Sequence, residues 1–183
     1  MTKNIIHNTS LISQKAKIGN NVSIGPYCII EDNVIIGDNT KIDSHTIIKQ
    51  YSTIGNNSHI FAHCVIGEIP QDKKYSGEKS KLIIGDNTVI RECCTLNRGT
   101  RDSGITKIGN NCLLMAYVHI GHDCIIENDV ILANGVQLGG HVLISDYAIV
   151  GGLTPVHQFC KIGAHSLVGG GLRVVQDIPP FII

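Results

Sequence analysis

The sequence contains no tryptophan and only three phenylalanines, and aromatic residues make up 4% of its 183 positions. This shortage excludes a wide core built around large rings and favours a narrow interior filled by branched aliphatic side chains. No apolar run approaches the roughly 18 residues that a membrane-spanning helix needs, so we expect no membrane insertion. Residues 1–10 lack the basic head and the apolar stretch of a secretory signal. We therefore expect a cytoplasmic protein.

An excess of charge of either sign is also missing. Fifteen lysines and arginines balance fifteen aspartates and glutamates, and no run of one sign occurs. Nucleic acids and anionic membrane surfaces both require a basic surface on the proteins that bind them. The balance therefore argues against nucleic acid as a partner.

A small branched aliphatic residue stands at almost every sixth position from Ile12 to Val174. Among the 28 multiples of six in this span, only Asp72, Glu78 and Asp102 break the pattern. A period of six fits neither a helix nor a single strand, so it indicates a repeating coil. Hexapeptide repeats are typical of parallel β-helices. In these, three hexads form one triangular turn, and equivalent residues of successive turns stack at about 4.8 Å.

The sequence therefore predicts an all-β fold, a parallel β-helix that forms a single domain over residues 1–183. Known hexapeptide coils are left-handed, which the periodicity itself does not determine. Glycine often follows the aliphatic position, and asparagine or aspartate comes soon after, as in residues 37–39. Such residues tolerate the positive φ angles and tight corners that a triangular coil requires.

Two segments interrupt the repeat without shifting its phase. Residues 68–82 contain Pro70, Gly77 and several lysines, and residues 97–107 contain two arginines and two glycines. We expect both segments to be loops expelled from an unbroken coil. Loops on a rigid scaffold commonly carry function. Tolerated surface insertions remain the alternative, more so for the second segment.

The phase of the cysteines indicates a structural role. Six of the seven lie four places after an aliphatic position, where other turns have valine, threonine, serine or alanine: Cys28, Cys64, Cys94, Cys112, Cys124 and Cys160. We expect these thiols to pack inside the coil in the reduced state, as suits a cytosolic protein. Redox or zinc chemistry is the less favoured alternative.

Histidine is frequent for so plain a repeat, with nine residues. In the segment 119–124 the interior positions fall to Ile120 and Cys124, so we expect His122 and Asp123 on an outward-facing surface between them. A step of three hexads places Gly140 beside His122 and His141 beside Asp123. One further turn brings His157 to the same face.

These residues can support acid–base chemistry. Histidine is the natural general base near neutral pH, and a carboxylate such as that of Asp123 can orient it. A glycine amide one turn away, at Gly140, could stabilise an oxyanion. No serine or cysteine lies in phase with His122, so direct attack by a substrate hydroxyl or amine is expected. The alternative is that these histidines lie on a solvent-exposed surface and have no chemical role.

A metal site is not expected. Carbonic anhydrases with this kind of coil place three histidines around zinc, two of them five residues apart. His119 and His122 are three apart, and Asp123 follows as an orienting carboxylate. We therefore expect neither a metal nor another cofactor.

Several stretches together resemble one enzyme family, the UDP-N-acetylglucosamine O-acyltransferases that begin lipid A synthesis. The stretches lie at residues 24–28, 71–78, 90–92, 98–100, 119–124, 156–163 and 176–180. The resemblance implies a homotrimer with active sites in clefts between neighbouring subunits. It also implies that acyl carrier protein donates a (R)-3-hydroxyacyl chain to the 3-hydroxyl of UDP-N-acetylglucosamine.

The same resemblance assigns roles to residues. His122 would be the general base, Asp123 would support it, and the Gly140 amide would stabilise the oxyanion. The implied substrate-binding positions are Gln71, Asp72, Lys74, His119, His141, His157, Gln158 and Gly170. A glycine at position 170 would leave room for a longer acyl chain.

The sequence departs from the family in three respects. Family members continue past the coil into a further helical domain, which is absent from this sequence. Asn97 stands where the family commonly has histidine, and Pro155 where it usually has alanine. The alternatives are an acyltransferase acting on a 3-amino sugar nucleotide, the related glucosamine N-acyl step, or a non-catalytic paralogue.

Overall fold

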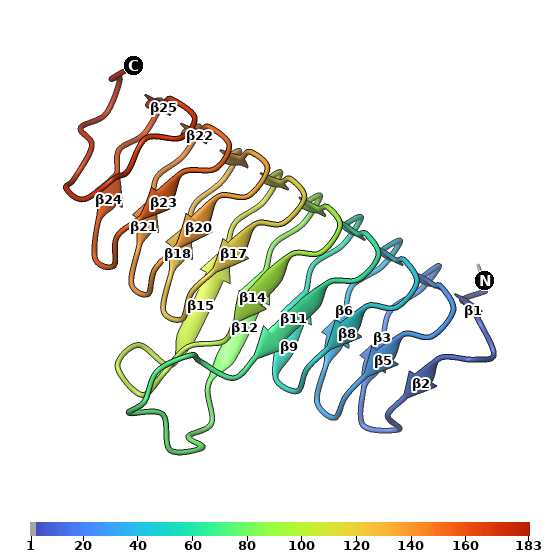
Figure 1. The fold of residues 1–183 in the computed structure, drawn as a ribbon. Helices are drawn as coiled ribbons and strands as arrows, with labels where there is room; N and C mark the ends of the chain where they lie inside the picture. Colours follow the sequence, from blue (N-terminus) through green and yellow to red (C-terminus); the bar gives the residue numbers. More distant parts are fainter. Residues whose placement is uncertain (1–2) are drawn as a thin grey trace.

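Short β-strands joined by tight corners wind into one continuous coil, with three strands in each turn and successive turns stacked along one axis (Figure 1). The computed structural model describes residues 3–183. Its strands form three parallel sheets of nine, eight and eight strands. The described part of the chain has no helix that could cross a membrane. This architecture agrees with the predicted left-handed β-helix.

The sheets take every third strand. Sheet A contains β1 (Ile5–Ile6), β4 (Ser23–Ile24), β7 (Lys41–Ile42), β10 (His59–Ile60), β13 (Val89–Ile90), β16 (Leu113–Leu114), β19 (Ile131–Leu132), β22 (Ile149–Val150) and β25 (Leu167–Val168). Sheet B contains β2 (Leu11–Ile12), β5 (Ile29–Ile30), β8 (Ile47–Ile48), β11 (Val65–Glu68), β14 (Thr95–Asn97), β17 (His119–Ile120), β20 (Gln137–Leu138) and β23 (Pro155–Val156). Sheet C contains β3 (Lys17–Ile18), β6 (Ile35–Ile36), β9 (Ser52–Ile54), β12 (Lys81–Ile84), β15 (Ile105–Ile108), β18 (Ile125–Ile126), β21 (Leu143–Ile144) and β24 (Lys161–Ile162).

The predicted turn of three hexads sets the register. Ile131 pairs with Ile149, and Ile149 pairs with Leu167, in adjacent parallel strands. Where a loop is expelled, the sequence separation between paired residues is longer: His59 pairs with Val89, and Val89 pairs with Leu113. The inserted residues therefore leave the pairing of the strands on either side intact.

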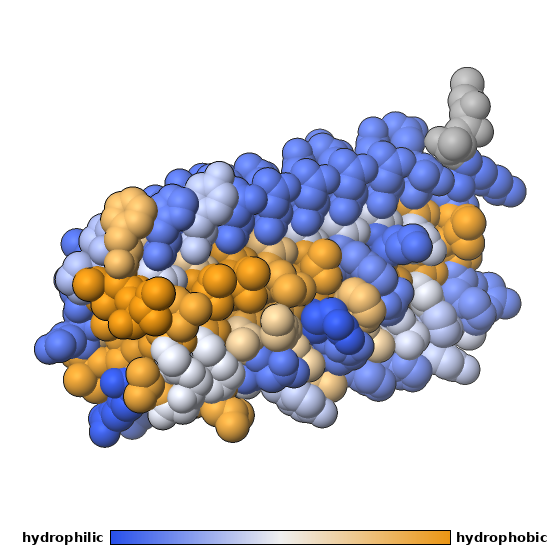
Figure 2. All heavy atoms as spheres, turned by 90° about the horizontal axis from the view of Figure 1, so that it is seen from above, coloured by the Kyte–Doolittle hydropathy of each residue, from blue (hydrophilic) through white to orange (hydrophobic). Residues whose placement is uncertain are grey.

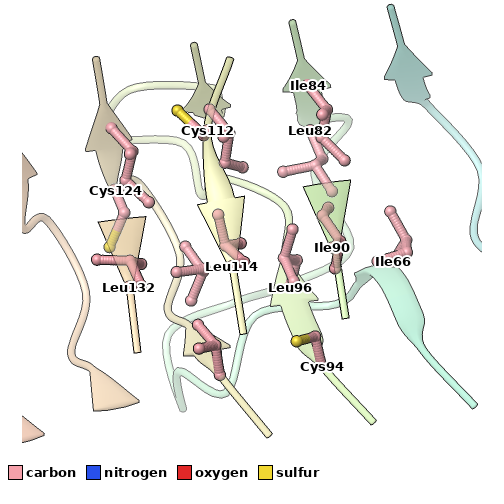
Figure 3. Packing of buried hydrophobic residues seen from close by; sticks show 14 of the residues in the cluster. Ile66, Leu82, Ile84, Ile90, Cys94, Leu96, Cys112, Leu114, Cys124 and Leu132 are labelled. Atoms are coloured by element: carbon pink, nitrogen blue, oxygen red, sulfur yellow. The ribbon is translucent and has the colours of Figure 1, made fainter. Parts of the chain in front are cut away.

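The aliphatic positions face the interior, as predicted. Figure 3 shows Ile66, Ile90, Leu114 and Leu132 directed into the space between the three sheets. Ile24 and the aliphatic residues of the six-residue repeat from Ile30 to Ile162 are almost fully buried. Ile12 and Ile18 in the first turn are only partly buried. Each fully buried side chain of this size contributes roughly 1.5–3 kcal/mol. The six in-phase cysteines are buried and free, which confirms their packing role.

The corners correct the expected use of glycine. The positive φ angle falls two residues after most glycines, on residues such as Asn39 (φ 58°) and Asn57 (φ 54°). The side chains of these asparagines stack, with Asn39 Nδ2 donating to Asn57 Oδ1 at 3.1 Å. At Gly37 a Cβ atom would lie 2.7 Å from the Gly55 carbonyl carbon of the next turn. Glycine is needed there for the close approach of turns and not for its φ angle.

Both interruptions are expelled loops, but each is shorter than expected. The first leaves the coil after β11 and returns at β12, so it spans residues 69–80. The second lies between β14 and β15 and spans residues 98–104. Strand pairing extends into the flanks because Leu82 and Thr106 are buried and continue the interior columns. Both loops project from the same corner, between sheets B and C (Figure 1).

Truncation of an interior side chain should weaken the coil. Ile60 is fully buried in sheet A, so Ile60→Ala should lower the free energy of unfolding by about 2–5 kcal/mol. Ile60→Val should lower it by only about 0.5–1.5 kcal/mol, because one methyl group is lost. Urea unfolding at one fixed protein concentration measures both. Equal stability of wild type and Ile60→Ala would contradict the assignment of this column to the core.

Candidate active site

The histidine-rich segment forms a corner of the coil. Residues 121–124 connect β17 to β18, and the two corners above it are residues 139–142 and residues 157–160. The expelled loops leave the same edge in the two turns below. The two expelled loops and the corner that carries His122 therefore lie along one edge of the prism, between sheets B and C.

His122 and Asp123 form a hydrogen-bonded pair. His122 Nδ1 lies 2.8 Å from Asp123 Oδ2, and the carboxylate can only accept, so Nδ1 carries the proton. Nε2 is then free to take a proton from a substrate. The expected outward-facing surface holds for His122, which is half-buried, but is wrong for Asp123, which is only 5% exposed. Asp123 has a φ of +60° at the corner, and the second loop covers its side chain.

Hydrogen bonds hold the Asp123 carboxylate in its ionised form. The Thr100 amide donates to Oδ1 at 2.9 Å, and the Thr100 hydroxyl donates to Oδ2 at 2.7 Å. The Ser103 hydroxyl also donates to Oδ1. Burial opposes ionisation, but the hydrogen bonds from Ser103, Thr100 and His122 outweigh it and lower the pKa of Asp123 to about 2. The carboxylate beside His122 therefore carries a negative charge at neutral pH.

Gly140 lies against the ring of His122, one turn above. A Cβ atom on Gly140 would lie 2.7 Å from His122 Nε2 and 2.6 Å from Cε1, so a side chain there would have to displace the ring. Among the described residues, none accepts a hydrogen bond from the Gly140 amide. The imidazole of His122 and the backbone of Gly140 thus lie against each other.

A groove runs over these groups. Its walls are Gln71, Asn97, His119, Gly121, His122, Gln137, Leu138, Gly139, Gly140 and Gln158. His119 is held by a contact of 2.8 Å between its Nδ1 and the Thr95 hydroxyl, and burial lowers the pKa of His119. His141 stacks on Phe159 and meets the ring of His122 edge-on at a centroid distance of 5.2 Å. The structure thus brings His119, His141, Gln71 and Gln158 to the pair.

The other predicted binding residues do not line this groove. Asp72 and Lys74 line an adjoining hollow between the two loops, together with Tyr75, Glu78 and residues 100–102. His157 is exposed at the corner of residues 157–160, with its Nδ1 near the carbonyl of Gln158. Gly170 lies after β25, at the corner between sheets A and B, and so at a different edge of the prism.

Three residues of the site were missed or left without a role by sequence reasoning. Thr100 and Ser103 contact Asp123 from the second loop, and Asn97 lines the groove while only 4% exposed. The Oδ1 atom of Asn97 has no hydrogen-bond partner among the described residues. The turn that contains the second loop is four hexads long. Four hexads before Asp123 is position 99, which is next to Thr100. That count is a signal that could have found the two hydroxyls.

Cys124 is not a nucleophile. It is fully buried, and its Sγ lies 3.1 Å from the carbonyl oxygen of Gly139. Burial raises the pKa of Cys124 to about 12, so the thiol stays protonated. Cys124 therefore cannot supply a nucleophile to this groove.

One group of side chains could hold a cation. The ligand atoms of His122, Asp123 and His141 lie within 4.8 Å of one another. Both oxygens of Asp123 already accept hydrogen bonds from Thr100, Ser103 and His122, so a cation would have to displace some of them. The donor set fits a hydrogen-bonded dyad better than a metal centre.

Comparison with known proteins points to one enzyme family. The model of bacterial transferase hexapeptide repeats matches residues 15–50 and 105–140. The acyl-[acyl-carrier-protein]–UDP-N-acetylglucosamine O-acyltransferase of Thiobacillus denitrificans is 54% identical over 97% of this chain, which covers 69% of that protein. Its counterpart in Aliarcobacter butzleri is 55% identical over 98% of the chain, covering 70%. The structure of the UDP-N-acetylglucosamine acyltransferase from Bacteroides fragilis superposes with a TM-score of 0.96 at 46% identity, over 97% of this chain and 70% of that one.

The buried carboxylate should make stability depend on pH. Because the pKa of Asp123 is lowered in the folded protein, its contribution is present above about pH 4 and is lost as the pH falls towards about 2. Between pH 6 and pH 3 wild type should lose about 1 kcal/mol more than Asp123→Asn in urea unfolding. Asp102→Asn serves as the control, because it removes an exposed carboxylate of the second loop. Parallel pH curves for wild type and Asp123→Asn would contradict the assigned charge.

Proposed function

Since the chain belongs to the family of acyl-[acyl-carrier-protein]–UDP-N-acetylglucosamine O-acyltransferases, enzymes of lipid A biosynthesis, we propose that its own His122 and Asp123 carry the acyl transfer. The acceptor is the 3-hydroxyl of UDP-N-acetylglucosamine, and the donor is a (R)-3-hydroxyacyl thioester of acyl carrier protein. The observation that carries this proposal is the free Nε2 of His122 beside the Gly140 amide, backed by ionised Asp123.

The reaction needs one base and one oxyanion donor. His122 Nε2 removes the proton of the acceptor hydroxyl, and the oxygen attacks the thioester carbonyl. The Gly140 amide stabilises the resulting oxyanion. As the carbon–sulfur bond breaks, the imidazolium returns the proton to the departing thiolate, so an ester and a free carrier thiol result. General base catalysis contributes roughly 10²–10⁴-fold, and an oxyanion donor roughly 10²–10³-fold.

Asp123 supports the base in two ways. Its bond to Nδ1 selects the tautomer with the free Nε2, and its charge stabilises the imidazolium that forms during the reaction. Because the carboxylate is buried, water screens this attraction little.

The first loop is suited to bind the nucleotide sugar. Gln71 lines the groove, and Asp72 and Lys74 line the hollow beside it, so one loop reaches from the base to the adjoining space. Lys74 offers a positive charge to a phosphate, and Asp72 and Gln71 offer hydrogen bonds. His119, His141 and Gln158 border the acceptor sugar in this proposal, and His157 the acyl donor.

A homotrimer would complete the site. The outward positions of sheet A from β13 to β25 are Val89, Leu113, Ile131, Ile149 and Leu167, an unbroken apolar stripe. Figure 2 shows apolar surface gathered towards the end of the coil remote from the N-terminus. Apolar patches of this kind mark contact surfaces. Gly170, at an edge of the prism away from His122, can then reach the acyl chain from the neighbouring subunit.

The remaining expectations concern the setting of the reaction. Seven free cysteines suit a reducing compartment, and we propose that the protein acts in the cytoplasm as a single β-helix domain over residues 1–183. The relatives extend beyond the matched region by about 30% of their length. The proposed mechanism uses no cofactor and no metal ion.

One observation favours a second acceptor. Asn97 presents an unpaired, buried carbonyl oxygen at the groove, and such an atom gains most from a donor-rich partner. A 3-amino sugar nucleotide would supply more N–H donors than a hydroxyl and would yield an amide. Mass analysis of the product, with both acceptors offered together, distinguishes ester from amide.

Removal of the base should abolish transfer. His122→Ala should lower kcat by about 10²–10⁴-fold, because the hydroxyl must then lose its proton to water. His7→Ala, which changes an exposed histidine of the first turn, should keep wild-type turnover. Transfer of radiolabelled acyl chain from acyl carrier protein measures both. Wild-type activity in His122→Ala would refute the proposed base.

Replacement of Lys74 should weaken acceptor binding. Lys74→Ala should raise KM for the nucleotide sugar by roughly 10-fold with a smaller effect on kcat, because an ion pair with a phosphate is lost. The neighbouring Lys73→Ala is the matched control, since Lys73 does not line the hollow. An equal KM for wild type and Lys74→Ala would mean that this loop is a surface insertion.

A further inference from the structure

The second expelled loop contacts the catalytic pair, although the proposed chemistry assigns it no step. Thr100 and Ser103 are the residues that reach back to Asp123 from the loop between β14 and β15. We propose that Thr100 and Ser103 are positioning residues, which hold the Asp123 carboxylate ionised and aligned with His122 Nδ1. This inference rests on the proposed role of His122 as the base.

The contacts bind both carboxylate oxygens. Oδ1 accepts from the Thr100 amide and the Ser103 hydroxyl, while Oδ2 accepts from the Thr100 hydroxyl and from His122. Two donors on each oxygen prevent rotation of the carboxylate about its Cβ–Cγ bond. The orientation of the His122 ring therefore depends on the loop and not only on its own corner.

All the donors from the loop are neutral. Among the described residues, no lysine or arginine forms an ion pair with Asp123, whose only charged contacts are His122 and His141. A buried carboxylate needs hydrogen bonds to remain ionised. A cationic partner would satisfy it too, but would compete with the imidazolium that forms during the reaction. Neutral hydroxyls stabilise the charge and leave its attraction for His122 intact.

The loop is itself preorganised. The Gly104 amide donates to the Thr100 carbonyl at 2.7 Å, and the Asp102 amide donates to the Thr100 hydroxyl at 3.2 Å. Arg101, between the two donors, binds the Ser76 hydroxyl at 2.7 Å and, through its amide, Glu78 at 3.2 Å. The loop that we assign to the nucleotide sugar therefore also supports the loop that holds Asp123.

The experiment compares Thr100→Val, Ser103→Ala and the double variant with Thr100→Ser, which keeps the hydroxyl. Each loss of a hydroxyl should lower kcat about tenfold, because a hydrogen bond to a charged group is lost, with a smaller effect on KM for the nucleotide sugar. Thr100→Ser should restore most of the turnover. Thr53→Val, on the outer face of β9 and outside the linings of both the groove and the hollow, should behave as wild type.

The pH dependence separates positioning from a general loss of structure. With fewer donors the Asp123 carboxylate takes up a proton more readily, so the acidic limb of the kcat profile should move to higher pH. A merely structural effect would lower kcat at every pH and leave the limb in place. Unchanged kcat and an unchanged acidic limb in the double variant would overturn the proposal.

A second measurement needs no substrate. With ¹³C-labelled aspartate, the Asp123 carboxyl resonance should not titrate in folded wild type above about pH 4, and should titrate above that pH in the folded double variant. If the double variant unfolds, the single variant Ser103→Ala, which changes an exposed position, is measured instead and should show the same change in the Asp123 resonance. If wild type transfers no acyl chain but the resonance shifts as expected, the proposed function fails and the positioning role stands. If transfer occurs and neither kcat nor the resonance responds, only the positioning role fails.

Discussion

Parallel stacking of identical three-hexad turns is the constraint on which the rest of this structure depends. Neighbouring strands lie about 4.8 Å apart, so each turn must present the same shape to the next. Interior columns can then hold only branched aliphatic or small side chains. The corners need one residue at positive φ, for which this chain mostly uses asparagine, aspartate, histidine and tyrosine, and glycines where the turns approach most closely. A residue that differs from these types is tolerated only where it points outward or where the chain leaves the coil.

The candidate site arises from departures of this kind. Two loops leave one edge of the prism, and the next three corners along that edge carry His122, Gly140 and Gln158 in one stacked column. The stacking that fixes the core thus also fixes the spacing between His122 and Gly140, the proposed base and oxyanion donor. The ring of His122 occupies the space that a side chain at position 140 would need, so the two groups are placed against each other by the repeat itself.

The electrostatics of the site come from neutral donors around one buried charge. Burial alone would favour a protonated Asp123, but hydroxyl and amide donors of the second loop reverse that preference and lower its pKa. In the described part of the chain no lysine or arginine pairs with this charge, so its field acts on His122. The same loop contacts the first loop through Arg101, so the proposed binding and catalytic residues are connected along one edge of the coil.

The sequence by itself determined the coil, because the hexad period is a local property that each repeat carries. It also placed His122, Asp123, Gly140 and His141 together, because each step of three hexads converts sequence into height along a straight axis. It could not assign the contacts of Thr100 and Ser103 or the burial of Asp123. Those depend on the path of a loop that obeys no period, and only the packing of that loop against the corner decided them.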